Sequence, residues 1–335
     1  MIAIKRKAML LAALCLGLGA PTMAQEAPAD SPPVPPTFTM TAERLTIPFA
    51  PPLDTPLTYR LRFERKRASG DSVVEFDQRL TFAKTETGYD LTLKALSLSS
   101  EGQHFDLGDP EVLGQVPTAL RVYLLPMVVE LDSAGDMVRM QDWPALQDSL
   151  RTMPEAMAKL SGEPVDEGAL AAVRSALDPF INASAEQAPA LMIRGWPALL
   201  GYGGLEFVSG ATLEGDTEID TPLWPDPIPA TLQVVVVRMR DGQIYLVQDA
   251  KVDDEALRMV MLSLIERIKS KATTKGVAAL AEEISALSIT DRLGINIDPV
   301  TGLPVTARIT RSTTAAMPTG SKTNGEIITI TRVAP

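Results

Sequence analysis

Apolar and polar residues alternate along several segments between residues 57 and 95. The alternation is clearest at 57–67, where Leu57, Tyr59, Leu61 and Phe63 form one face, and it recurs at 74–82 and 89–95 with polar turns between the runs. Period-two alternation joined by short turns predicts antiparallel hairpins with one buried face. A further hairpin is predicted from 128–131 to 137–140.

The segment 143–200 has a different pattern. It is rich in Ala, Leu, Met and Glu, and residues such as Met153 and Met157 recur at helical spacing. We expect two or three helices inserted between β segments. The methionines are interpreted as core packing, with a flexible binding groove as the alternative. Two Trp-Pro-Ala-Leu sequences, at 143–146 and 196–199, are interpreted as similar helix entries with proline in the first turn.

The last third returns to β structure and adds one clear amphipathic helix. Leu257, Val260, Met261 and Leu264 follow helical spacing after the acidic start Asp253-Asp254-Glu255, which predicts a helix packed on a sheet by one apolar stripe. A second short helix is predicted at 277–285. Strands are expected at 205–221, 229–239, 243–252 and 326–333. Two more are expected, one before and one after 298–304.

These elements together predict an α+β fold. Strands occupy both ends of the ordered chain and the helical block is internal, so we expect a large curved antiparallel sheet, like half of a barrel, with helices packed on one face. The pattern leaves two arrangements open, one broad sheet or two related lobes.

The first 24 residues resemble a secretory signal peptide. Three basic residues, Lys5 to Lys7, precede an apolar run at 8–20, and small residues end at Ala24. This pattern predicts export to the periplasm with cleavage after Ala24. The apolar run is short for a bilayer span of roughly 20 residues, so we expect cleavage rather than a retained anchor.

The signal peptide is followed by a proline-rich linker at 25–37 and then by the α+β domain at 38–335. Cleavage would remove Cys15, the only cysteine, so a mature chain would have no disulfide and no thiolate metal ligand. No second apolar run is long enough to span a membrane, and we expect no transmembrane segment in the mature chain.

Composition narrows the classes of partner. The formal net charge is −11, and loss of the leader makes the chain still more acidic, which argues against nucleic acid and against anionic lipid head groups. With 45% hydrophobic residues the chain is expected to be globular. It has no phosphate-loop, serine-hydrolase or zinc-protease motif, and nothing in it predicts a cofactor or a particular catalytic residue.

Two groups of residues are candidates for metal binding. His104, the only histidine, lies two residues before Asp106, and this pair could bind a divalent metal. We favour an ordinary exposed histidine in a polar loop, because a second histidine for a familiar zinc set is missing. Any Ser-His-Asp triad would also have to use His104.

The second group is a row of acidic residues at every second position. An extended strand would place all of them on one face, where carboxylate oxygens could bind calcium. We favour a solvated sheet face whose charges are offset by Arg238, Arg240 or Lys251 on neighbouring strands. The row consists of Glu214, Asp216, Glu218 and Asp220.

The turn Asp298-Pro299-Val300-Thr301-Gly302-Leu303-Pro304 between two strands is similar to one found in exported bacterial proteins. With the leader and the order of elements, it resembles the periplasmic lipoprotein-carrier (LolA/LolB-like) fold. That resemblance implies a strongly curved sheet wrapped around helices, with an apolar interior. The chain is longer than a simple carrier, the block at 143–200 has no obvious counterpart there, and no family site residue carries over.

Three functions remain open at this stage. The first is a non-enzymatic periplasmic envelope protein that binds a lipid or a hydrophobic peptide in an apolar groove. The second is an envelope hydrolase that uses carboxylates near 214–220 or around His104. The third is a structural or assembly protein with an envelope protein as its partner and no small ligand. The first is the leading hypothesis, the sequence does not rank it decisively above the third, and it does not identify ligand-binding residues.

Overall fold

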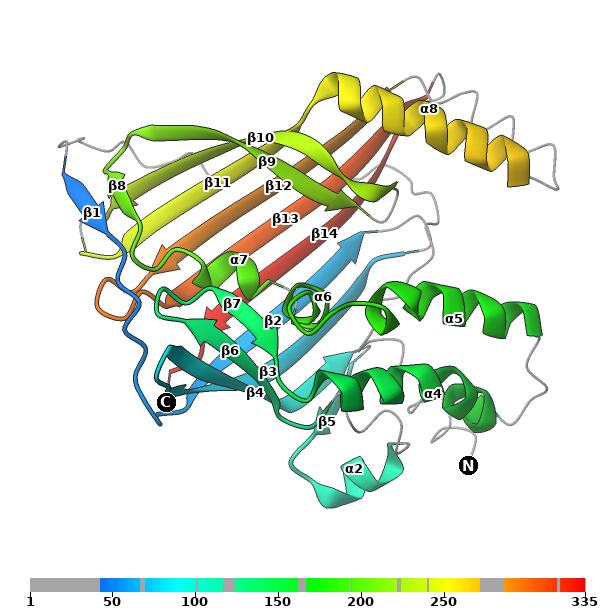
Figure 1. Ribbon diagram of the computed structural model, residues 1–335, viewed down its shortest axis with the longest axis horizontal. Coiled ribbons are helices and arrows are strands. Elements are labelled where there is room, and N and C mark those ends of the chain that lie inside the picture. The colour runs from blue at the N-terminus through cyan, green and yellow to red at the C-terminus, as the bar shows by residue number, and fades with distance from the viewer. Residues whose placement is uncertain are drawn as a thin grey trace.

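The computed structural model describes residues 43–66, 70–100, 102–116, 124–161, 167–193, 195–221, 224–239, 241–271, 286–317 and 320–334. Its main feature is one large antiparallel sheet, which is strongly curved but not closed into a barrel (Figure 1). The α+β prediction is confirmed, and the strands form one sheet rather than two lobes. The leader, the linker and the helix expected at 277–285 lie outside the described residues.

The large sheet contains twelve strands in the order β7-β6-β4-β3-β2-β14-β13-β12-β11-β10-β9, with β5 paired to β4, while β1 and β8 form a separate pair. Because the last strand pairs with β2, it joins the two halves of the sheet. The strands are β1 (Arg44–Thr46), β2 (Leu57–Lys66), β3 (Ser72–Lys84), β4 (Gly88–Ser100), β5 (Gln103–Asp106), β6 (Met127–Asp132), β7 (Met137–Met140), β8 (Glu206–Val208), β9 (Thr212–Thr221), β10 (Trp224–Arg238), β11 (Ile244–Val252), β12 (Ala286–Ile297), β13 (Pro304–Met317) and β14 (Gly320–Arg332).

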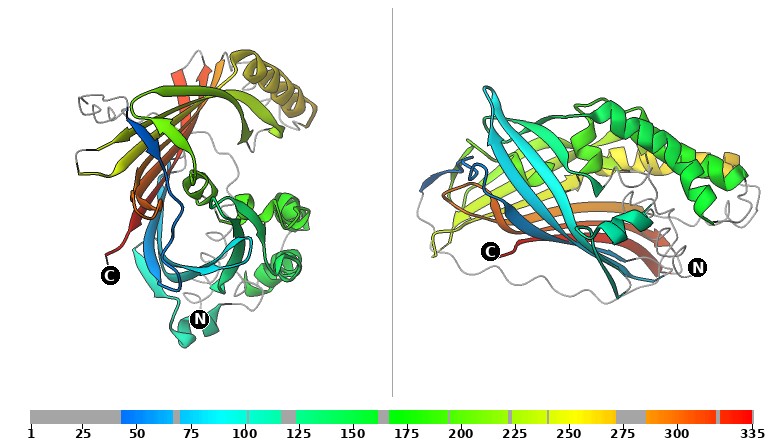
Figure 2. Two further views of the ribbon diagram at one scale, coloured as in Figure 1. Left: turned by 60° about the vertical axis from the view of Figure 1, so that its left-hand side comes forward. Right: turned by 90° about the horizontal axis from the view of Figure 1, so that it is seen from below.

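The helices α4 to α8 lie on the hollow side of the sheet, which we call its inner face (Figure 2). Among its described residues, the block expected at 143–200 contains four helical segments rather than two or three, because it includes the short helical turns α6 and α7. Prolines in the first turns of α4 and α7 confirm the two helix entries. The helices are α2 (Pro110–Gln115), α4 (Trp143–Ser161), α5 (Glu167–Ile181), α6 (Ala188–Met192), α7 (Pro197–Leu200) and α8 (Asp254–Lys271).

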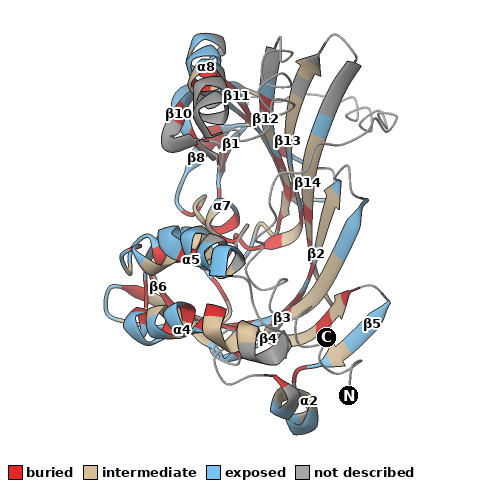
Figure 3. Ribbon diagram, turned by 90° about the vertical axis from the view of Figure 1, so that its right-hand side faces the viewer, coloured by how far each residue is buried: buried red, intermediate tan, exposed pale blue. Residues whose placement is uncertain are grey.

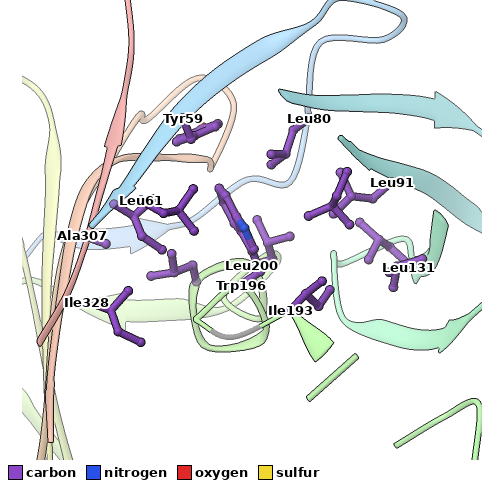
Figure 4. Packing of buried hydrophobic residues seen from close by; sticks show 14 of the residues in the cluster. Tyr59, Leu61, Leu80, Leu91, Leu131, Ile193, Trp196, Leu200, Ala307 and Ile328 are labelled. Atoms are coloured by element: carbon purple, nitrogen blue, oxygen red, sulfur yellow. The ribbon is translucent and has the colours of Figure 1, made fainter. Parts of the chain in front are cut away.

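The main hydrophobic core lies between the inner face and the segment that carries α6 and α7 (Figure 4). Trp196 is at its centre, with its ring edge-on to the ring of Tyr59 at 4.9 Å between centroids. Its indole Nε1 donates a hydrogen bond to Oε1 of the buried Gln78 at 2.8 Å. The alternation seen in the sequence therefore has a direct cause, since Tyr59 and Leu61 pack inward.

A second, smaller core lies under α8, on the same face of the same strands. Leu257 and Val260 of α8 pack against a group that includes Ala230 of β10 and Ile289 of β12. The carboxylate of Asp253 accepts hydrogen bonds from the backbone N–H groups of Glu255 and Ala256, and so caps the start of the helix. The expected stripe of α8 is confirmed for these two buried residues.

Candidate functional site

The first metal-binding candidate is on the short strand β5. His104 is exposed, and its Nδ1 is 2.8 Å from the hydroxyl of Ser99 on β4. Asp106 instead accepts a hydrogen bond from the backbone N–H of Gly108 at 2.8 Å. The structure thus gives the two candidate residues separate partners. Within the described ranges, no three His, Cys, Asp or Glu residues are grouped so that they could hold a metal.

The sequence did not reveal the contact between Ser99 and His104. The two residues are opposite each other in the pairing of β4 with β5, so only the register brings them together. A serine hydroxyl hydrogen-bonded to a histidine nitrogen can act as a nucleophile with its general base, provided that a third group orients the histidine ring. The described contacts supply no carboxylate that orients this ring, and Asp106 is bonded to its own turn.

The acidic row lies on β9, at one end of the sheet order. Glu214, Asp216 and Glu218 are exposed and share the outer face of the strand, as predicted, and Asp220 occupies the next alternate position. Glu214 accepts a hydrogen bond from the amide of Gln233 on β10 at 2.9 Å. The row is therefore spread along a strand instead of converging on one point, as calcium ligands do.

The described contacts do not pair this row with Arg238 or Lys251, two of the three residues expected to offset its charge. The guanidinium of Arg238 lies 3.1 Å from the carboxylate of Glu43, and so pairs with the residue that precedes β1 rather than with β9. Lys251 is separated from the row by one strand, because Thr231 of β10 lies between Lys251 and Asp216 in the register. Arg240 lies outside the described residues.

The inner face carries a feature that the sequence did not reveal, a row of four alternating charges across four adjacent strands. We call Arg65, Glu326, Arg311 and Asp291, from β2, β14, β13 and β12, the charged row. Each is opposite the next in the strand register. Arg65 Nε donates to Glu326 at 2.8 Å, and Arg311 Nε donates to Asp291 at 2.9 Å.

The charged row lies on the inner face because its members alternate with outer-face residues in step with the core. Arg311 is two positions from Ile309, and Glu326 is two positions from the buried Ile328. Solvent still reaches the row, since the side chain of Arg311 is 43% exposed and that of Asp291 is 19% exposed. Charges away from bulk water are costly unless they are paired, and the alternation pairs each member with opposite charges.

Apolar side chains flank the charged row on the side of the main core. The rings of Phe63 and Phe76 stack at 5.4 Å between centroids, and both rings are only half-buried, as is Ile309 on β13. Figure 3 shows half-buried residues along this part of β2 and β14, in contrast to the exposed outer surfaces of α4 and α5. This part of the inner face therefore offers apolar contact area next to charge.

On the other side of the row, Asn324 of β14 is opposite Thr313 of β13. The amide oxygen of Asn324 is buried and has no hydrogen-bond partner among the described residues. A buried acceptor without a donor is unfavourable by about 1–3 kcal/mol, and native structures rarely leave one unmet. The inner face thus combines apolar surface, paired charges and an unmet acceptor in one region.

A hydrogen bond between Tyr202 and Gln248 joins the segment after α7 to the inner face of the sheet at β11. The hydroxyl of Tyr202 donates to the amide oxygen of Gln248 at 2.6 Å. Burial raises the pKa of the Tyr202 hydroxyl well above its ordinary value, so it stays protonated and remains a donor. This contact fixes the glycine-rich corner after α7 to the sheet.

None of the helices in the described ranges has the length and hydrophobicity that a membrane-spanning helix needs. No protein-family model matches the chain, and no characterised protein sequence matches it either.

Proposed function

We propose that this protein is a non-enzymatic binding protein of the bacterial envelope, which holds an amphipathic ligand with an acyl chain against the inner face of its sheet. The observation that carries this proposal is the half-buried apolar surface around Phe63, Phe76 and Ile309, directly beside the charged row. Apolar surface left partly open in a curved sheet is suited to an apolar chain.

The chemistry of the inner face supports an amphipath rather than a wholly apolar molecule. The acyl chain would contact the rings of Phe63 and Phe76, and its polar end would lie at the charged row near Arg311. A hydroxyl of the ligand could donate to the unmet oxygen of Asn324. Burial of about ten methylene groups contributes about 8 kcal/mol, part of which the entropic costs of association offset.

The signal-peptide pattern at 1–24 supports export to the periplasm as part of the same proposal. An acidic chain binds poorly to the anionic surface of a membrane. This favours a carrier or a binding protein that takes up single molecules over a protein that coats a lipid surface.

The first test is native mass spectrometry of the protein isolated from its own envelope fraction, followed by solvent extraction. We expect an additional mass that extracts as a lipid. An additional mass that proves to be a peptide would replace the acyl ligand with a hydrophobic peptide and overturn the ligand class. A bare protein that also takes up no fluorescent anthroyloxy fatty acid would overturn the proposal.

The second test asks whether the charged row recognises the head of the ligand. Arg311→Met is compared with Arg308→Met, which removes an exposed arginine from the outer face of the same strand. We expect Arg311→Met to weaken binding of the labelled fatty acid at least about fivefold, with little effect on its methyl ester. Equal effects of the two variants would overturn the assignment of the head group to the charged row.

A further inference from the structure

The strand β9 forms one end of the large sheet, and its outer edge has no neighbouring strand within the described part of the chain. It pairs in unbroken antiparallel register with β10 from Thr212 to Ile219. In such a strand every second residue directs its backbone N–H and C=O groups away from its partner. No backbone hydrogen bond found among the described residues meets these groups on β9.

Proteins usually blunt a long sheet edge with a proline, a bulge, a lysine or a covering segment. The ten residues of β9 include no proline and no lysine, and the register to β10 stays regular through the middle of the strand. Such an edge is a template for one more strand.

The two faces of β9 differ in a way that selects the added strand. The outer face presents the exposed carboxylates of Glu214, Asp216 and Glu218. On the inner face Leu213 is 47% exposed, and a Cβ placed on Gly215 would meet no atom within 4 Å. An added strand would therefore find negative charge on one side, and an apolar contact and open space on the other.

A second copy of this chain does not fit this edge through its own β9. Antiparallel pairing of two β9 strands would bring one acidic row beside the other, and like charges that face each other across strands are destabilising. The acidic row thus discourages self-association and leaves the edge available to a strand of opposite charge.

We propose that β9 binds a protein partner by strand addition, and that the partner supplies an extended segment with Lys or Arg at alternate positions and aliphatic residues between them. The backbone of the segment pairs with the open edge, its basic residues face Glu214, Asp216 and Glu218, and its aliphatic residues contact Leu213. This interaction surface is separate from the surface proposed for the ligand on the inner face, so the two proposals are independent of each other.

The test uses the full protein and an eight-residue acetylated peptide in which Lys and Val alternate. Hydrogen exchange followed by mass spectrometry should show slower exchange of backbone amides in 212–221 when the peptide is bound. A peptide in which Pro replaces every Val keeps the charge but cannot form a regular strand. We expect it to bind at least about tenfold more weakly, and a peptide of alternating Glu and Val should not bind.

The matched protein variants have equal changes of net charge. The variant in which Glu214, Asp216 and Glu218 are all replaced by Lys should bind the Lys–Val peptide at least about tenfold more weakly than wild type. Reversal of three exposed acidic residues elsewhere, Asp71, Glu86 and Glu111, should leave binding within about twofold. Equal binding of the Lys–Val and Lys–Pro peptides, equal effects of the two triple variants, or protection outside β9 would each overturn the proposal.

Discussion

Arg332, near the end of the chain, donates a hydrogen bond from Nη1 to the carboxylate of Asp298 at 3.2 Å, and so joins β14 to the turn between β12 and β13. Its Nη2 donates to the carbonyl oxygens of Leu303 at 3.3 Å and Pro304 at 3.1 Å, and its Nε lies 3.2 Å from the hydroxyl of Tyr59. One half-buried guanidinium thus connects the last strand, the turn and β2 at one end of the sheet.

Arg332→Met should destabilise the protein by about 2–3 kcal/mol, because the half-buried carboxylate of Asp298 loses its charged partner and two carbonyl oxygens each lose one of their donors. Urea unfolding followed by circular dichroism measures this change. Arg308→Met, on the outer face of β13, is the control and should change the free energy of unfolding by less than about 0.5 kcal/mol. Equal losses in the two variants would show that the contacts of Arg332 contribute no more than an exposed arginine does.

The turn should also give the stability of the protein a defined pH dependence. Partial burial opposes ionisation of Asp298, but hydrogen bonds from the backbone of Val300 and from the side chains of Arg332 and Thr301, together with the charge of Arg332, outweigh it. The pKa of Asp298 is therefore lowered below its ordinary value of 3.8. Because the folded pKa is the lower one, the carboxylate stabilises the fold above the ordinary value, and this contribution is lost as the pH falls through the folded pKa.

The comparison that checks this is wild type against Asp298→Asn, by urea unfolding between pH 7 and pH 2.5. Wild type should be the more stable at pH 7, and its advantage should shrink only below about pH 4. A difference that stays constant over the whole range would contradict an ionised Asp298 as its source.

Gly302→Ala should be more destabilising than an equivalent change at Gly204. Both glycines have φ angles in the left-handed region, +72° and +75°, where an L residue is unfavourable by about 1–2 kcal/mol. A Cβ at Gly302 would also overlap the carbonyl oxygen of Pro48, whereas at Gly204 nothing lies within 4 Å. Thermal unfolding of the two alanine variants separates backbone strain from steric overlap, and equal losses would remove the overlap from the explanation.

Periodicity in the sequence was sufficient to predict most elements of the sheet. The alternation at 57–63 reports burial directly, since Tyr59 and Leu61 point into the core while the residues between them do not. The number of helical segments was underestimated, because α6 and α7 are too short to show a helical period. Whether the strands form one sheet depends on the pairing of β2 with β14, and no local pattern encodes that contact.

The candidate site was less accessible to sequence analysis, for a similar reason. The members of the charged row are far apart in the chain, at positions 65, 291, 311 and 326, and only the register of four strands aligns them. The acidic residues of β9 were visible because they belong to one strand, but their location at the sheet edge was not. A pattern within one element can be recognised in the sequence, whereas a site assembled from several strands can be recognised only once the fold is known.

Trp196→Phe should cost about 1–3 kcal/mol, mainly because the buried amide oxygen of Gln78 loses its donor. The double variant Trp196→Phe, Gln78→Leu removes both polar partners, and so should recover part of this loss. Equilibrium unfolding of the single and double variants gives the coupling between the two side chains. Strictly additive losses would show that the hydrogen bond is not what makes this tryptophan important.

The ligand proposal predicts that bulk added to the inner face blocks binding, while the same bulk on the outer face does not. Thr313 lies on the inner face of β13, opposite Asn324, and Thr310 lies on the outer face of the same strand. Thr313→Trp should weaken binding of an anthroyloxy fatty acid at least about tenfold, because the indole occupies space that the chain or head group needs. Thr310→Trp should bind the same fatty acid with an affinity within about twofold of that of wild type. Thermal unfolding should show that both variants are folded. If Thr310→Trp weakened binding as much as Thr313→Trp, the ligand could not be assigned to the inner face.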